Sequence, residues 1–166
     1  MAGKIFINYR RVESLKDAQH LKTLFDKTFG ANRVFLDVRG IDGGANWLQT
    51  LERQVAASAA MVVLIGKDWA NLKDESGNRR LDNPNDFVRF EISQALLRHQ
   101  PIIPVSIDDA AMPNPSELPA NLMPLSLNTL AQRSASLRKK ASNSAGVEVT
   151  GLMPALSRRS TTAASA

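Results

Sequence analysis

Residues 60–66 read AMVVLIG, and no side chain in this run is charged or polar. A strand that is covered on both faces is apolar throughout, whereas a strand with one face in water alternates between apolar and polar residues. The length and composition of the run therefore predict a buried strand at the centre of a parallel sheet.

Four further segments are typical of strands. Three are apolar runs, and the last is weaker and is expected at a sheet edge, where its proline is tolerated. In chain order the four segments are KIFINY at 4–9, RVFLD at 33–37, PIIPVSI at 101–107 and LMPLSL at 122–127.

Helical patterns separate these strands. Apolar side chains recur every three or four positions over residues 15–29, 47–55 and 88–96, and Ser14 with Asp17 resembles a capping box. Strands that alternate with helices imply right-handed βαβ units and a parallel sheet. We therefore expect an α/β fold: a flavodoxin-like three-layer sandwich, with a parallel five-stranded sheet and helices on both faces.

A chain of 166 residues has the length of one domain of ordinary size. Residues 1–130 hold the strand and helix patterns, whereas residues 131–166 are rich in Ser, Ala and Thr and poor in large apolar side chains. We expect one domain at 1–130 and a basic tail at 131–166 that is partly disordered.

The positive charge is confined to the end of the chain. Residues 1–127 carry 15 Lys or Arg and 15 Asp or Glu, so residues 128–166 supply the whole net charge of +5. A surface that binds nucleic acid needs clustered cations on the folded part, usually with aromatic side chains beside them. We therefore do not expect the folded core to bind nucleic acid.

Several kinds of site are excluded. The chain has no cysteine, which rules out disulfides and thiolate sites and agrees with a cytoplasmic protein. No apolar run approaches the length of a membrane span. His20 and His99 are isolated, so no metal site is expected. The GxSxG, GxxxxGK[ST] and GxGxxG motifs are absent as well.

Glu91 stands out in the helical run DFVRFEISQALLRHQ at 86–100. It flanks an apolar arc that includes Val88, Ile92 and Ala95. A glutamate in that place is partly desolvated, and desolvated carboxylates are enriched at active sites. Two plainer interpretations remain open: a first-turn glutamate favoured by the helix dipole, or a side chain whose stem packs while its head reaches water.

The predicted topology gives Glu91 neighbours. In open α/β sheets, ligands bind beyond the carboxyl ends of the strands. Arg10 and Arg11, the glycine-rich loop at 40–44 and the segment that precedes Glu91 all belong to that edge. We expect a binding site there, although the arginines are equally compatible with solvated loop charges.

A single carboxylate suits one kind of glycoside cleavage. Glycosidases usually need two carboxyl groups, because one must protonate the leaving group. The nicotinamide of NAD+ carries a cationic ring nitrogen and departs neutral, so no proton is needed. Glu91 would then stabilise positive charge on the ribose, Trp47 or Phe87 would pack against flat rings, and Arg10 and Arg11 would meet the diphosphate. Both aromatic residues are equally typical of a core.

Five segments, in order along the chain, resemble the TIR (Toll/interleukin-1 receptor) domain family. FINYRR at 6–11 resembles the family's FISYRR, with Asn8 in place of the usual Ser. The remaining segments resemble the second strand and BB loop, the third strand, the third helix and the fourth strand, and they are VFLDVRGIDGGANW at 34–47, VVLIG at 62–66, DFVRFEI at 86–92 and PIIPV at 101–105.

The resemblance implies a TIR fold and an NAD+ glycohydrolase, which releases nicotinamide and yields ADP-ribose or a cyclic isomer in signalling or defence. NAD+ is then a substrate, and no cofactor is implied. Members that cleave NAD+ carry WxxxE in the third helix, which places the catalytic glutamate on Glu91 and puts Phe87 where Trp is common. The substrate-facing residues carried over are Tyr9, Arg10, Arg11, Asp42, Gly44, Trp47 and Phe87.

A second function is compatible with the same resemblance. Many TIR domains are non-catalytic adaptors that act by binding to one another, or to other TIR domains, through the BB loop and neighbouring helices. The glutamate is not required in them. We expect the enzyme to be active on self-association as well, so self-association alone does not separate the two functions.

Overall fold

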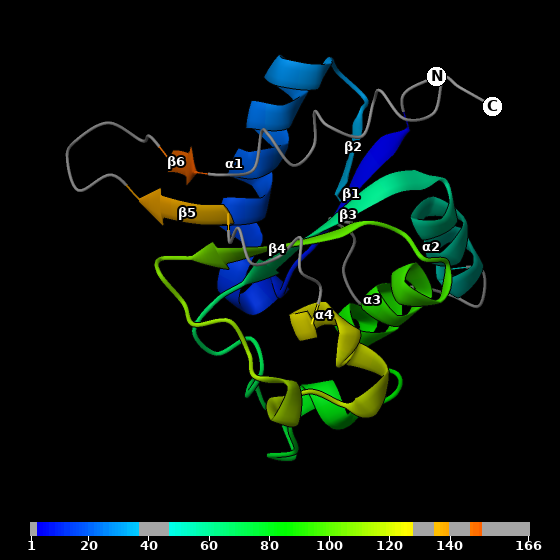
Figure 1. Cartoon of the computed structure of the whole chain (residues 1–166), viewed down its shortest axis with the longest axis vertical. Coiled ribbons are helices and arrows are strands. Elements are labelled where there is room, and N and C mark those ends of the chain that lie inside the picture. The colour runs from blue at the N-terminus through cyan, green and yellow to red at the C-terminus, as the bar shows by residue number, and fades with distance from the viewer. Residues whose placement is uncertain (1–2, 37–46, 128–134, 140–146, 151–166) are drawn as a thin grey trace.

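The computed structural model describes residues 3–36, 47–127, 135–139 and 147–150. They form a six-stranded sheet in the order β2-β1-β3-β4-β5-β6 (Figure 1). Neighbouring strands are parallel, except that β6 runs antiparallel to β5. The strands are β1 (Lys4–Asn8), β2 (Val34–Leu36), β3 (Ser58–Ile65), β4 (Ile102–Ile107), β5 (Ala135–Lys139) and β6 (Val147–Thr150).

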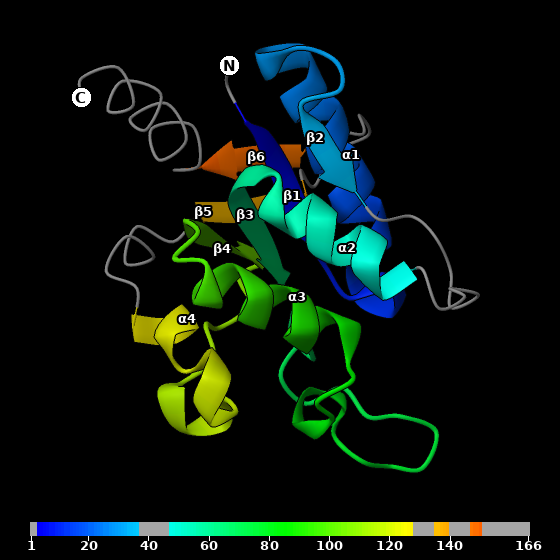
Figure 2. The same ribbon diagram turned by 90° about the vertical axis from the view of Figure 1, so that its right-hand side faces the viewer.

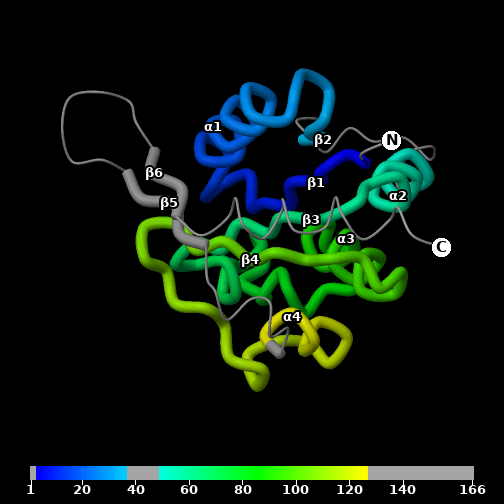
Figure 3. Tube along the Cα trace, turned by 45° about the horizontal axis from the view of Figure 1, so that its top comes forward, coloured from blue at the N-terminus to red at the C-terminus, as the bar shows by residue number. Residues whose placement is uncertain are grey.

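Helices cover both faces of the sheet. One face is covered by α1, and the other by α2, α3 and α4, as Figures 2 and 3 show. The α/β three-layer architecture predicted from the sequence is therefore confirmed. The helices are α1 (Arg11–Phe29), α2 (Trp47–Ala56), α3 (Phe87–Leu97) and α4 (Pro124–Leu127), with 3-10 turns η1 (Arg80–Asp82), η2 (Pro115–Glu117) and η3 (Ala120–Leu122).

The central strand β3 is buried on both faces, as its composition predicts. Val62 and Leu64 pack in the cluster beneath α1, whereas Met61 and Val63 pack in the cluster beneath α2 and α3. Full burial of one such side chain contributes roughly 1.5–3 kcal/mol to folding. Hydrophobic packing on both faces thus fixes β3 as the middle of the molecule.

The strand predicted at 122–127 is wrong. Leu122 ends η3, and Pro124–Leu127 forms α4. Proline is favoured in the first turn of a helix, and Leu122 and Leu125, three residues apart, both reach the core next to α3. This spacing suits a helical turn, because alternate positions in a strand point to one face and positions three apart do not.

The fifth parallel strand is instead β5, within the range predicted to be a tail. Val105, Ser106 and Ile107 of β4 pair with residues 135–137, and β6 then pairs antiparallel with β5. The division of the chain at residue 130 stays a prediction. Two segments beyond it nevertheless extend the sheet.

The polar segment between β3 and α3 is more than a surface loop. Its side chains Trp69 and Leu81 are fully buried in the same cluster as Val88 of α3. Between them, the Asp74 carboxylate accepts hydrogen bonds from the backbone N–H groups of Ser76 and Asn78 and closes a turn. The segment is thus anchored to the core on both sides of an exposed turn.

Among the described residues, no helix has the length and apolar character that a membrane crossing needs.

Candidate functional site

Glu91 is the fifth residue of α3, and its side chain lies on the buried face of the helix. It is 7% exposed and has Val88, Ile92 and Ala95 of the core on the same face. The expected desolvation is confirmed. The first-turn interpretation is wrong, because Glu91 lies in the second turn of the helix.

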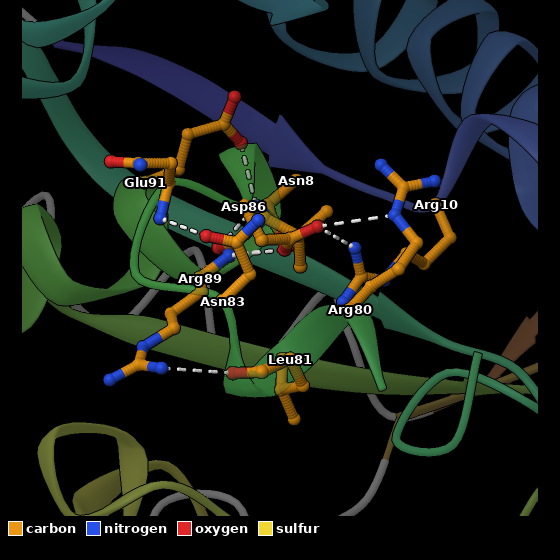
Figure 4. A network of polar contacts seen from close by, with 10 residues as sticks. Asn8, Arg10, Arg80, Leu81, Asn83, Asp86, Arg89 and Glu91 are labelled. Atoms are coloured by element: carbon orange, nitrogen blue, oxygen red, sulfur yellow. Dashed lines mark hydrogen bonds and ion pairs between the residues drawn. The ribbon is translucent and has the colours of Figure 1, made fainter. Parts of the chain in front are cut away.

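Asn8, the last residue of β1, holds this carboxylate. Its side chain is fully buried, and its Nδ2 donates to Glu91 Oε2 at 2.6 Å and to the Val88 carbonyl oxygen at 3.3 Å. The carboxamide therefore ties the end of β1 to α3 (Figure 4). Sequence reasoning did not select Asn8, although a polar side chain at the end of an otherwise apolar strand is a signal that could have found it.

Arg10 and Asp86 form a buried ion pair beside Asn8. Arg10 Nη1 lies 2.6 Å from Asp86 Oδ2, with side-chain exposures of 1% and 2%, and Arg80 Nε lies 3.4 Å from the same oxygen. The other oxygen, Asp86 Oδ1, accepts from the Arg89 N–H at 3.0 Å and caps the start of α3. Burial lowers the pKa of Arg10, and the Asp86 carboxylate opposes this shift.

Asp86 was missed as a site residue. The signal was present in the sequence, because an aspartate directly before a helical run is a typical N-cap. Only its ion pair with Arg10 lies beyond what a local pattern can indicate. One carboxylate thus links the segment after β1, the segment before α3 and the first turn of α3.

The alternative that Arg10 is a solvated loop charge is wrong. The arginine is enclosed by the protein, and its Nε and Nη2 have no hydrogen-bond partner within the described parts of the chain. Its carbonyl oxygen accepts from the N–H groups of Glu13 and Ser14 and from Ser14 Oγ. Ser14 has non-helical angles and α1 begins at Arg11, so the capping box expected at Ser14 marks a kink rather than the helix start.

The remaining predicted residues are divided between described and undescribed parts of the chain. Tyr9 is half-buried and packs against the hydrophobic cluster beneath α1. Arg11 is exposed. Phe87 is the first residue of α3 and is half-buried. Trp47 begins α2, but its side chain is outside the described set. Asp42 and Gly44, with the rest of the predicted BB loop at 37–46, also lie outside the described residues.

A second carboxylate, Glu13, lies at the same edge of the sheet. Its Oε1 accepts from the Asp68 N–H at 2.8 Å, just beyond the end of β3. Gly66 makes this approach possible, because a Cβ at residue 66 would overlap the Glu13 carboxylate. Glu13 therefore joins α1 to the turn after β3, a contact that the sequence did not reveal.

The arrangement has a definite chemical character. A desolvated carboxylate acts strongly on nearby charge, because a low dielectric weakens the screening of electrostatic interactions. The hydrogen bond from Asn8 Nδ2 fixes the direction of the Glu91 carboxylate. Such a carboxylate is suited to stabilising positive charge on a bound molecule. No cluster of His, Asp and Glu in the described residues has the geometry of a metal site.

Similar proteins are found among solved structures and among family models. Among 28 matching chains of solved structures is one from the activated Roq1 resistosome that directly recognises the pathogen effector XopQ (TIR domains). It is 17% identical, with a TM-score of 0.49, over 80% of this chain and 75% of that chain. A search of curated proteins finds no match. The family model for the TIR domain matches residues 5–140. The chain belongs to the TIR domain family.

Proposed function

We propose that this protein is an NAD+ glycohydrolase in which Glu91 is the catalytic residue. The observation that carries the proposal is the buried Glu91 carboxylate, which a hydrogen bond from Asn8 fixes at the carboxyl edge of the sheet. Ligands of open α/β sheets bind at this edge. A fixed, desolvated anion is suited to a reaction that develops positive charge next to it.

The reaction would cleave the bond between ribose C1′ and the nicotinamide nitrogen. The bonding electron pair leaves with the nitrogen, so nicotinamide departs neutral and the ribose acquires oxocarbenium character. The Glu91 carboxylate stabilises that charge. A water oxygen then bonds to C1′ and loses a proton, which gives ADP-ribose, or the adenine of the same nucleotide attacks and gives a cyclic isomer.

We assign substrate binding to the same residues that the resemblance to TIR domains implies. Arg11 is exposed and is therefore accessible to a diphosphate in solvent, whereas Arg10 is enclosed by the protein. Phe87, one turn before Glu91 on α3, supplies an aromatic face. Tyr9, Asp42, Gly44 and Trp47 complete the proposed substrate-facing set.

Self-association is part of the proposal. Glu91 is 7% exposed in the single chain, and we infer that a rearrangement around it admits the ribose C1′. Contact between two copies through the BB loop and the neighbouring helices would supply that rearrangement. Activity should then rise more steeply than in proportion to protein concentration.

The test is NAD+ consumption by the purified, concentrated chain. Glu91→Gln keeps the shape of the side chain and removes its charge, and it should lower the rate by at least about 100-fold. Glu75→Gln is the matched control, because Glu75 is exposed in the turn that the Asp74 carboxylate closes. Equal rates in the wild type and Glu91→Gln, or no cleavage by the wild type even under crowding or induced assembly, would contradict the proposal.

The alternative is a non-catalytic TIR scaffold, and the enclosure of Glu91 in the single chain also supports it. In that case Glu91 serves only to join β1 and α3. The wild type would then self-associate without consuming NAD+. Glu91→Gln would lower stability and leave no enzymatic defect to measure.

A further inference from the structure

Asn8 occupies a position at which a central strand normally carries an apolar side chain. The three residues before it, Ile5, Phe6 and Ile7, are all buried and apolar, and Asn8 is buried as deeply as they are. Burying an amide is unfavourable unless its hydrogen bonds are satisfied. The burial of the Asn8 amide must therefore be explained by the groups that it contacts.

The orientation of the carboxamide follows from its partners. Glu91 Oε2 and the Val88 carbonyl oxygen are both acceptors, at 2.6 Å and 3.3 Å from Nδ2. A flipped amide would turn its oxygen toward two acceptors and lose both bonds. The NH2 group must therefore face α3, where its two hydrogens serve the carboxylate and the helix backbone.

Resting on the proposed function, we propose that Asn8 is a positioning residue for Glu91. Its amide holds the carboxylate in one direction, and its second hydrogen bond fixes the turn of α3 from which Glu91 projects. The role is distinct from catalysis, because Asn8 acts through Glu91 and has no assigned contact with NAD+.

The choice of residue type follows from this geometry. Aspartate has the same shape but no donor, and it would place a second carboxylate against Glu91. Serine, which the TIR motif usually carries here, is shorter and has one donor, so it cannot serve both Glu91 and Val88. Asparagine alone among these three combines the reach with two donors.

The first experiment reads the carboxyl group directly and needs no enzymatic activity. The pKa of Glu91 is measured by 13C NMR in the wild type, in Asn8→Ser and in Asn8→Asp, with Glu91→Gln to assign the signal. Loss of the donor should raise this pKa in Asn8→Ser, and the second carboxylate should raise it further in Asn8→Asp. The control is Asn71→Asp, because Asn71 is exposed and lies before the turn that Asp74 closes. This substitution should leave the pKa of Glu91 unchanged.

The wild type provides a readout that does not depend on variant folding. The 15N shift of the Asn8 amide should follow the titration of Glu91, because the two groups share a hydrogen bond. An Asn8 amide that is insensitive to that titration would overturn the inference. So would an unchanged Glu91 pKa in a folded Asn8→Ser variant.

The second experiment measures kcat and KM for NAD+ across pH. A positioning role predicts that Asn8→Ser lowers kcat by about 10-fold to 100-fold with little change in KM, and that the acidic limb of its pH profile moves upward. A raised KM with unchanged kcat would contradict positioning. If the wild type cleaves no NAD+, the proposed function fails, while the NMR titration still decides whether Asn8 controls Glu91.

Discussion

The Asp86 carboxylate lies 2.6 Å from the Arg10 guanidinium, and both groups are shielded from water. The same carboxylate caps α3, the helix that carries Glu91. A buried charge is tolerated when it is paired, and losing one partner leaves the other uncompensated. The pair therefore couples the end of β1 to the start of the helix that carries Glu91.

Asp86→Asn should destabilise the protein by about 3–5 kcal/mol, because it leaves the Arg10 charge buried without a counter-charge. Urea unfolding at neutral pH measures the loss. Asp82→Asn is the control: Asp82 is paired with Arg79 at the surface, where water screens the interaction, so its effect should be small. A change of less than about 1 kcal/mol in Asp86→Asn would show that the pair contributes little.

Gly66→Ala should displace the Glu13 carboxylate and break its hydrogen bond to the Asp68 N–H. We expect a loss of about 0.5–1.5 kcal/mol, since the broken hydrogen bond is exposed and water can replace the lost partner. A double-mutant cycle with Glu13→Ala checks the mechanism. The substitution at Gly66 should cost much less once the Glu13 side chain is gone, and additive losses would refute the proposed overlap.

Leu125→Ala should destabilise the fold by about 2–5 kcal/mol. The substitution opens a cavity where α4 packs on the hydrophobic cluster beneath α2 and α3. Met123 is 38% exposed on the neighbouring turn, and Met123→Ala should have a much smaller effect. Thermal unfolding compares the two variants. Similar losses at both positions would indicate that residues 122–127 do not pack as a helical turn.

The pKa of Asp82 should lie below its ordinary value, because Arg79 donates a hydrogen bond to the ionised carboxylate. A carboxyl pKa that is lower in the folded state stabilises the protein above the unfolded pKa of about 3.9, and this contribution is lost as pH falls through the folded value. NMR titration of Asp82 gives the pKa directly. In Arg79→Gln it should rise toward the ordinary value, and an unchanged pKa would rule out Arg79 as the cause.

The main layers of the fold were predictable, because burial of an element leaves a pattern of apolar residues in its local sequence. The run at 60–66 is apolar at every position, and the helical spacing around Val88 and Ile92 identified both α3 and the buried setting of Glu91. The sequence pattern was ambiguous at residues 122–127. A short apolar segment with a proline fits an edge strand or a helical turn, and packing against α3 selected the turn.

The contacts that define the candidate site left no such pattern in the local sequence. Asn8 and Glu91 are 83 positions apart, and Arg10 and Asp86 are 76 apart, so no local periodicity relates them. Hydrophobic patterning alone was enough to indicate strands β1 to β4, helices α1 to α3 and a desolvated Glu91. Which donor holds that carboxylate, and which anion neutralises Arg10, depends on how the end of β1 meets α3, because hydrogen bonds and buried ion pairs form only between groups that folding has already brought within about 3 Å.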